Sequence, residues 1–430
     1  MIQRYTTEDT KTLKEALLSR SQFDFKEVNA TVTDIIDTVK REGDGALYAY
    51  AKAFDGVALT HLKISTHEMK RAFDALDPEL LKAFEHAKRN LTRYHEKQRE
   101  ADFMDAEPGI QRQQRITPID RVGLYIPGGS AAYPSSVLMN VIPAQIAGVK
   151  HLVMVTPPQK EGVNQTILAL AYWLGIEEVY QVGGAQAIAA LAYGTDTIPK
   201  VDKVVGPGNL YVATAKKQLL GTIGIDSFAG PSEVIILADE STKASYIAAD
   251  MIAQAEHDAL ASAITFSTSS TLLDEVEKEL ARQLKLRQRQ DIIKASLQQY
   301  GALVKVEHFD EAVAWVNALA PEHLQLMMTQ AEDFMPAIRN AGAIFIGAHT
   351  PEAVGDYIGG TNHTLPTSST ARFASGLSTY DFCKRTSVLR YDADAFADVV
   401  DAIERMALEE GLDGHAYSAT IRKDDPLDKT

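Results

Sequence analysis

The most constraining feature of the sequence is a regular alternation of short apolar runs and longer helical patterns that begins near Arg121. The runs have the length of buried strands, and each is followed by a segment whose apolar residues recur at helical spacing. The alternation starts again at Val234 and continues to Ile346. Strands that alternate with helices predict parallel sheets with right-handed crossovers. We therefore expect an α/β fold with two similar halves.

The boundaries of the expected elements follow from the same patterns. The predicted strands are Val122–Ile126, His151–Val155, Glu178–Val182, Lys203–Val205, Val234–Ala238, Ala263–Ser267, Leu303–Val306, His323–Met327 and Ala343–Ile346. Outside the helices that connect them, helical spacing predicts helices over Val28–Arg41, Glu68–Arg99 and Ala395–Glu409.

Three strands of the first half end in glycine-rich turns, which are Pro127-Gly128-Gly129-Ser130, Gly183-Gly184-Ala185-Gln186 and Gly206-Pro207-Gly208-Asn209. Ligands of open α/β sheets bind at the carboxyl ends of strands. Glycine lets backbone N–H groups approach a phosphate, and the N-terminus of the following helix favours negative charge. Tight turns also use glycine for steric reasons, and none of the three has the G-x-G-x-x-G spacing. The turns are therefore compatible with a dinucleotide site without requiring one.

Composition excludes several classes of protein. A length of 430 residues exceeds one typical domain. The net charge of −15, from 58 acidic and 43 basic residues, disfavours nucleic acids and anionic membranes as partners. No apolar run reaches the ~18 residues of a membrane span. The first residues lack the apolar region of a signal peptide, and a single cysteine, Cys383, excludes an internal disulfide, so we expect a cytoplasmic protein.

A set of nitrogen and oxygen donors in the second half suits a metal ion. Gln254 and His257 stand three residues apart in the predicted helix Ser245–Asp258, which places both side chains on one face. A solvated polar face is the alternative reading of this pair. With Asp356 and His415 the donors suit zinc, although no HExxH or CxxC spacing selects them.

The order and spacing of nine motifs resemble the histidinol dehydrogenase family, from about Arg121 to Arg422. The motifs are Tyr125-Ile126-Pro127-Gly128-Gly129, Val182-Gly183-Gly184-Ala185-Gln186-Ala187, Gly206-Pro207-Gly208-Asn209, Ala229-Gly230-Pro231-Ser232-Glu233, Gln254-Ala255-Glu256-His257, Pro321-Glu322-His323-Leu324, Gly355-Asp356-Tyr357, Gly360-Thr361-Asn362-His363 and Glu410–His415.

The resemblance implies a zinc- and NAD-dependent enzyme that oxidises L-histidinol to L-histidine through the aldehyde. It implies two similar incomplete Rossmann-like domains with parallel sheets, plus small N-terminal helical and C-terminal segments. It also implies a homodimer with one Zn²⁺ per subunit, in which the C-terminal region reaches the partner's site. The implied zinc ligands are Gln254, His257, Asp356 and His415; the substrate contacts are these four with Ser232, His323 and Glu410; the NAD contacts are Tyr125, Gln186 and Asn209.

The implied catalytic residues are Glu322 and His323. His323 would accept the alcohol proton as hydride leaves for NAD, and Glu322 would activate the water that hydrates the aldehyde. Cys383 lies outside every motif, so a thiohemiacetal route is rejected. His363 is expected to make a structural hydrogen bond rather than to bind metal.

Two alternatives remain at this point. One is a dehydrogenase of the same fold that acts on another polar alcohol, such as a sulfonated diol. The other is a catalytically silent zinc protein, which would not need Glu322, His323, Gln186 and Asn209 together.

The expected domains follow the resemblance. They are a helical segment over 1–24, a discontinuous zinc and substrate domain over 25–120 and 233–378, an NAD-binding domain over 121–232, and a C-terminal segment over 379–430 that contributes to the dimer.

Overall fold

The computed structural model describes residues 2–6, 26–128, 132–227 and 230–423, which belong to two units of the chain. The first unit consists of Met1–Gln98 and Ile119–Phe382, and the second of Arg99–Pro118 and Cys383–Thr430. No helix among the described residues is long and apolar enough to cross a membrane.

The first parallel sheet of the larger unit has the strand order β6-β5-β4-β7-β8. Its strands are β4 (Arg121–Tyr125), β5 (His151–Thr156), β6 (Glu178–Gln181), β7 (Lys203–Val205) and β8 (Gly224–Ile225). The connecting helices are α6 (Pro134–Ala147), α7 (Gln165–Trp173), α8 (Gly184–Tyr193) and α9 (Leu210–Leu219). Counted along the chain, this order is 3-2-1-4-5, the first five strands of the Rossmann order.

The second parallel sheet has the order β1-β11-β10-β9-β12-β13. Its strands are β1 (Gln3–Thr6), β9 (Glu233–Ala238), β10 (Ser262–Ser267), β11 (Ala302–Lys305), β12 (His323–Met327) and β13 (Ala343–Ile346). Its helical elements are α10 (Ala244–Ala255), α11 (Ser270–Leu284), α12 (Gln290–Tyr300), α13 (Phe309–Leu319), α14 (Ala331–Phe334), η4 (Met335–Ala337), α15 (Glu352–Tyr357), η5 (Thr370–Arg372) and η6 (Thr379–Phe382). From β9 onward the order is again 3-2-1-4-5, so the expected two similar α/β halves are confirmed.

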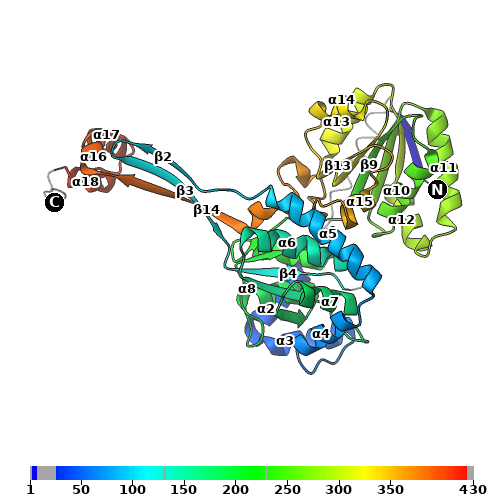
Figure 1. Ribbon diagram of the computed structural model, residues 1–430, viewed down its shortest axis with the longest axis horizontal. Helices are drawn as coiled ribbons and strands as arrows, with labels where there is room; N and C mark the ends of the chain where they lie inside the picture. Colours follow the sequence, from blue (N-terminus) through cyan, green and yellow to red (C-terminus); the bar gives the residue numbers. More distant parts are fainter. Residues whose placement is uncertain (1, 7–25, 129–131, 228–229, 424–430) are drawn as a thin grey trace. The chain divides into compact units, whose positions relative to one another are not determined.

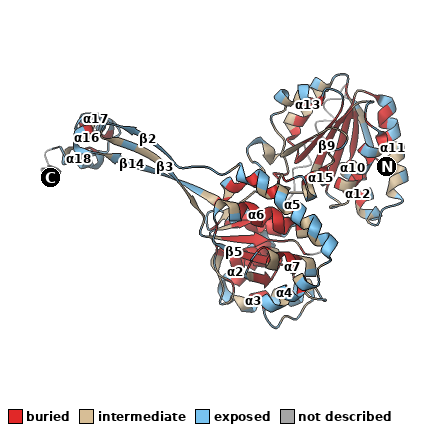
Figure 2. Cartoon of the chain, in the orientation of Figure 1, coloured by how far each residue is buried: buried red, intermediate tan, exposed pale blue. Residues whose placement is uncertain are grey.

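Both sheets are covered on both faces, which explains why their strands are nearly continuous apolar runs. In the second sheet, α10, α11 and α12 pack on one face and α13 and α14 on the other (Figure 1). The central strands of both sheets are buried (Figure 2).

The helices that precede the first sheet pack against that sheet. They are α2 (Lys26–Glu42), α3 (Asp44–Tyr50), the π-helix η3 (Ala51–Asp55), α4 (Thr66–Asp74) and α5 (Pro78–Glu96). Residues of α4 and α5 share a core with α6 and α7, whereas α2 and α3 share one with α8 and α9. This packing differs from the expected grouping of residues 25–120 with residues 233–378.

Two N-terminal expectations need correction. Gln3–Thr6 is a strand paired with β11, within the segment 1–24 expected to be helical, most of which lies outside the described residues. The predicted helix Glu68–Arg99 is two helices, because Asp77 caps a new N-terminus by accepting from the Glu79 N–H at 2.9 Å. Pro78 follows at the first helical position, where its missing N–H costs nothing, and it cannot continue the preceding helix.

The described residues of the second unit form an antiparallel sheet with the order β14-β3-β2, followed along the chain by three helices. Its elements are β2 (Phe103–Glu107), β3 (Ile110–Pro118), β14 (Cys383–Tyr391), α16 (Ala393–Ala397), α17 (Val400–Glu409) and α18 (Asp413–Thr420). The single helix predicted over Ala395–Glu409 is therefore two, and Asp392 caps the first of them by accepting from the Ala395 N–H at 2.9 Å.

Candidate functional site

Two of the glycine-rich turns, those at Gly184 and Gly206, meet at the carboxyl edge of the first sheet. The Gly184 N–H, at the start of α8, donates to the Tyr125 hydroxyl at the end of β4 over 3.1 Å. Gly206, after β7, has a φ of +113°, and a Cβ added there would lie 2.1 Å from the Tyr125 carbonyl oxygen. Only glycine fits this close approach. Burial raises the pKa of Tyr125 to about 12, so its phenol stays neutral.

Gln186 and Asn209 belong to the same edge. Gln186 lies buried in the first turn of α8. Asn209 is the exposed N-cap of α9, and its side-chain oxygen accepts from the N–H groups of Tyr211 and Val212 at 3.1 and 3.2 Å. Capping occupies the carboxamide oxygen, so the amide NH₂ is the group that Asn209 can offer to a ligand.

A second cluster lies at the amino ends of β9 and β12. Glu322 and His323 stand at the start of β12, and Ser232 immediately precedes β9. Gln254 is in the last turn of α10, which runs back to this edge. The predicted helix Ser245–Asp258 ends at Ala255, so His257 lies beyond it and does not share a helical face with Gln254. The two residues nevertheless belong to one cluster.

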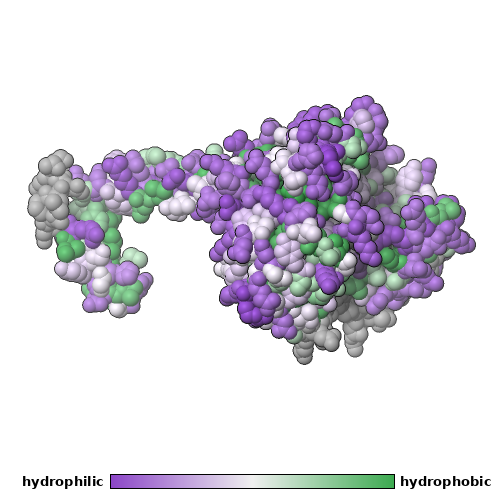
Figure 3. Space-filling model, turned by 90° about the horizontal axis from the view of Figure 1, so that it is seen from below, coloured by the Kyte–Doolittle hydropathy of each residue, from purple (hydrophilic) through white to green (hydrophobic). Residues whose placement is uncertain are grey.

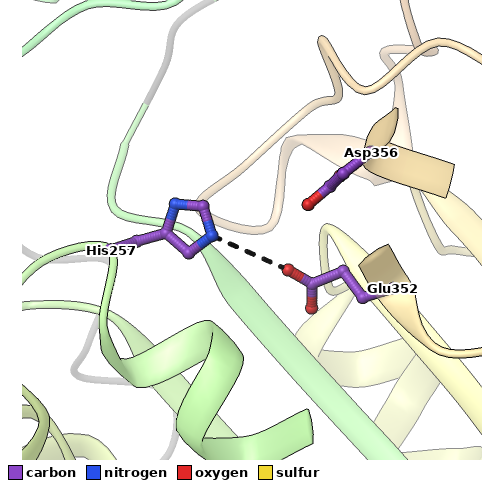
Figure 4. A group of neighbouring side chains, drawn as sticks. All are labelled: His257, Glu352 and Asp356. Atoms are coloured by element: carbon purple, nitrogen blue, oxygen red, sulfur yellow. Dashed lines mark ion pairs between the residues drawn. The ribbon is translucent and has the colours of Figure 1, made fainter. Parts of the chain in front are cut away.

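The cluster contains a group with metal-ligand geometry that consists of His257, Glu352 and Asp356 (Figure 4). Their ligand atoms all lie within 4.8 Å of one another. Glu352 and Asp356 come from the short helix α15, where a spacing of four residues places both carboxylates on one side. Sequence reasoning missed Glu352 because this stretch reads as an irregular loop. The i, i+4 spacing of its two acids was the signal that could have identified it.

Gln254 is fully buried and bonds to this group. With its amide nitrogen turned toward Glu352, it donates to the two carboxylate oxygens at 2.8 and 3.3 Å. In this orientation the NH₂ group of Gln254 is hydrogen-bonded to Glu352. The carboxamide oxygen of Gln254 is then the atom that can bind a cation.

The cluster concentrates acidic groups in a buried place. Burial raises the pKa of Glu322 and of Glu352 well above the usual carboxyl range, and raises the pKa of Asp356 to about 7. Each carboxylate lies within 4.0 Å of a histidine nitrogen. Burial lowers the pKa of His257, so this imidazole is neutral and can act as a ligand. A bound cation would stabilise the ionised carboxylates, and the donors fit a divalent metal such as zinc.

His323 is held in one defined orientation. Its Nδ1 lies 3.2 Å from the Glu233 carbonyl oxygen, which accepts a hydrogen bond from the ring N–H. Its Nε2 is buried and has no hydrogen-bond partner among the described residues. Burial lowers the pKa of His323 to about 3, so the ring is neutral at neutral pH. Because the Glu233 carbonyl oxygen can only accept, the proton sits on Nδ1 and Nε2 presents a lone pair. Both amide hydrogens of Gln254 then go to the Glu352 oxygens, and the amide nitrogen lies 3.2 Å from Nδ1 without a hydrogen bond to it.

His363 makes the structural contacts expected of it. Its Nε2 lies 3.1 Å from the Ser136 hydroxyl, and its Nδ1 lies 3.0 Å from the Asp356 carbonyl oxygen. Both ring nitrogens are thus engaged, and the backbone of α15 is fixed next to a candidate ligand. Tyr133 stacks on the ring of His257 with centroids 6.3 Å apart.

Glu410 and His415 belong to the second unit. Glu410 is the C-cap of α17 and His415 lies in α18, and both are exposed. Of the expected metal ligands, the structure brings together Gln254, His257 and Asp356 within the larger unit.

Gly355 determines how closely α15 approaches β13. A Cβ added to Gly355 would lie 2.5 Å from the ring of Phe345. We expect Gly355→Ala to displace Asp356, to weaken zinc binding, and to lower the free energy of unfolding by about 1–3 kcal/mol through overpacking. Thermal unfolding and zinc titration measure these effects. Gly45→Ala, in open space on α3, is the matched control and should stabilise by about 0.4–1 kcal/mol. Unchanged zinc affinity in Gly355→Ala would contradict the expectation.

Two Rossmann-like sheets and a cluster of imidazole and carboxylate groups with metal-ligand geometry define this chain as an α/β protein with a candidate metal site. A model of the histidinol dehydrogenase family matches residues 18–423. The chain belongs to the histidinol dehydrogenase family.

Individual relatives agree over nearly the whole chain. A histidinol dehydrogenase of Listeria monocytogenes is 47% identical over 397 residues, which cover 92% of this chain and 93% of that protein. One of Geobacillus kaustophilus is 50% identical over 399 residues, with coverages of 92% and 94%. The crystal structure of histidinol dehydrogenase from Elizabethkingia anophelis matches with a TM-score of 0.93 at 35% identity and covers 98% of each chain.

Proposed function

We propose that the chain oxidises L-histidinol to L-histidine in two steps through the aldehyde, with one bound Zn²⁺ per subunit and with NAD as the hydride acceptor. The observation that carries this proposal is the buried Nε2 lone pair of His323, which lies 4.0 Å from Asp356 in a cluster with metal-ligand geometry. Alcohol oxidation requires a general base that takes the hydroxyl proton and a group, here the bound metal ion, that orients the substrate beside that base.

The residues proposed to hold zinc are Gln254, His257, Asp356 and His415. The donors present in the larger unit are a carboxamide oxygen, a neutral imidazole and a carboxylate, which suit zinc with open positions for substrate. Bound zinc would orient the substrate by its imidazole and amino group, which is a template role. Glu352 supports this set by accepting hydrogen bonds from Gln254.

His323 is proposed to act as the base in both oxidations. Its Nε2 would accept the hydroxyl proton, and bound NAD would supply the hydride acceptor. Each oxidation thus removes one hydride and one proton from the substrate, which is two electrons and two protons in all. The resulting imidazolium is stabilised by Glu322 and Glu352, whose carboxylate oxygens each lie 3.7 Å from Nδ1. Between the two steps the aldehyde is hydrated, and Glu322 is placed to take the proton from the attacking water.

The remaining proposed contacts are those of the substrate and of NAD. Ser232, which bonds to Glu322, is proposed to contact the substrate, and Glu410 to bind its ammonium group. Tyr125, Gln186 and Asn209 are proposed to contact NAD at the carboxyl edge of the first sheet.

We also propose a homodimer in which Glu410 and His415 reach the partner's site. The second unit exposes many apolar side chains for its size, and apolar patches are visible on it in Figure 3. The exposed apolar side chains of this unit include Leu389, Met406, Leu408 and Tyr417, which are 53–67% exposed. Exposed apolar surface of this kind is typical of a protein–protein interface.

The competing substrate class is another polar alcohol, such as a sulfonated diol. The relatives and the solved structure described above are all named histidinol dehydrogenases, which favours histidinol.

The test is NADH formation from L-histidinol by the purified protein, with and without prior removal of metal by a chelator. We expect two NADH per histidinol, loss of activity after chelation, and recovery on zinc addition. Absence of turnover in protein that still binds zinc would contradict histidinol as the substrate and would favour another polar alcohol. Full activity after complete metal removal would contradict the role of zinc.

A further inference from the structure

We propose that Lys216 and Asp226 form a buried positioning pair that fixes the Gly206 turn and thereby sets the affinity for the dinucleotide. The inference rests on the proposed function, because it assumes that NAD binds at the carboxyl edge of the first sheet. Neither residue belongs to a motif that the sequence analysis selected.

The pair holds both polar groups of one glycine. Lys216 Nζ lies 2.7 Å from Asp226 Oδ1, and the two side chains are 1% and 5% exposed. The other carboxylate oxygen of Asp226 accepts from the Gly206 N–H at 2.8 Å. Lys216 Nζ also donates to the Gly206 carbonyl oxygen at 2.5 Å. The peptide groups on the two sides of Gly206 are therefore both fixed by charged partners.

Gly206 needs these hydrogen bonds because a glycine backbone has no strong conformational preference of its own. Glycine adopts positive φ as readily as negative φ, so a glycine turn is flexible unless neighbouring groups restrain it. Here φ is +113°, and the turn lies directly against the backbone of Tyr125. A rotation at Gly206 would move the turn away from Tyr125 and would also move Asn209 at the start of α9.

The three anchoring points come from different elements. Gly206 follows β7, Asp226 follows β8, and Lys216 lies in the last turn of α9, from which its long side chain reaches back to the turn. The pair thus ties α9 and the Gly206 turn that precedes it to the carboxyl ends of two adjacent strands. The free N–H groups and the dipole of a helix N-terminus attract phosphate, and their effect depends on their position.

Stability alone does not account for a buried ion pair at this place. Removing two charges from water costs free energy that their attraction repays only in part, and apolar residues of similar volume are often equally stable. Charged partners do provide short, directional hydrogen bonds to a peptide group. The charged pair therefore fixes the geometry of the turn, which an apolar pair could not do.

The experiment compares Lys216→Met/Asp226→Leu with the wild-type chain. Replacing both residues leaves no unpaired buried charge, so we expect thermal unfolding near the wild-type temperature. The dissociation constant of NADH, measured by fluorescence titration, should rise roughly 10- to 100-fold, by analogy with the loss seen when residues that orient metal ligands are removed. The KM for NAD should rise in parallel, whereas zinc content and the KM for histidinol should stay unchanged.

The matched control is Lys203→Met. Lys203 is also a largely buried lysine of the first sheet, and it donates to the Asp381 carbonyl oxygen at 2.7 Å, but it stands at the opposite end of β7 from Gly206. NADH binding by this variant should equal that of the wild-type chain. Equal loss of NADH binding in the control would overturn the inference.

The outcomes separate this inference from the proposed function. If the wild-type chain binds NADH and the double variant binds it equally well, the positioning role is overturned alone. If the wild-type chain binds no NADH, the proposed cofactor fails and the inference fails with it. If the double variant does not fold, Asp226→Glu decides: it keeps the charge pair but shifts the oxygens, and wild-type NADH affinity in that folded variant overturns the inference.

Discussion

Replacement of His323 by asparagine is expected to reduce turnover by about 10²- to 10⁴-fold, the usual contribution of a general base. The physical reason is the loss of the Nε2 lone pair, which is buried and has no other hydrogen-bond partner among the described residues. An asparagine amide can still donate to the Glu233 carbonyl oxygen, so the local fold should persist. Zinc should remain bound, because His323 is not among the proposed ligands.

The measurement for His323→Asn is kcat together with zinc content of the same preparation. His349→Asn, an exposed histidine in the segment that precedes α15, is the control and should behave as the wild-type chain does. Loss of zinc from His323→Asn would show that the division between ligands and base is wrong.

Replacement of His257 by asparagine is expected to remove metal and activity together. His257 is the only imidazole in the group of metal-ligand geometry that the described residues form, and its neutral ring faces Glu352 Oε1 across 4.0 Å. Without it, the remaining donors are oxygens, which suit hard cations better than zinc. Zinc affinity should fall by at least roughly 10- to 100-fold, since even indirect partners of a ligand contribute that much.

Zinc titration followed by an activity assay at each zinc concentration checks this prediction. Activity of His257→Asn should not return at the zinc concentration that restores the chelated wild-type protein. Wild-type zinc affinity with lost activity would instead assign His257 to catalysis. NADH binding should be unchanged, because the glycine-rich turns of the first sheet do not depend on His257.

Much of the fold could be predicted because strand and helix periodicities are local properties of the sequence. All the predicted strands appear in the structure, within a residue or two of their expected ends. Of the strands from β4 to β13, only the two-residue β8 was not predicted. The packing of α2 to α5 on the first sheet was not predicted, because amphipathic helices reveal a buried face but not the surface that it covers. Helix breaks at Asp77 and Asp392 depend on single capping residues, which a window of apolar spacing does not detect.

The candidate site was predictable in its residue types and only partly in its geometry. Gln254, His257 and Asp356 come together as expected, but Gln254 and His257 do so from a helix end and a following bend rather than from one helix face. Glu352 was missed because its stretch reads as an irregular loop. The pair Lys216–Asp226 was missed because a hydrogen bond between residues 10 positions apart leaves no local pattern in the sequence. The resemblance named motif residues, whereas burial and hydrogen bonding identified the groups that support them.

Anomalous scattering at the zinc absorption edge, from crystals of protein purified with zinc, tests the central claim most directly. We expect one peak per subunit in contact with His257 Nε2, the Asp356 carboxylate and the Gln254 carboxamide oxygen, with His323 Nε2 outside bonding distance of the metal. A peak elsewhere on the chain, or one coordinated by His323 Nε2, would contradict the proposed division between metal site and base.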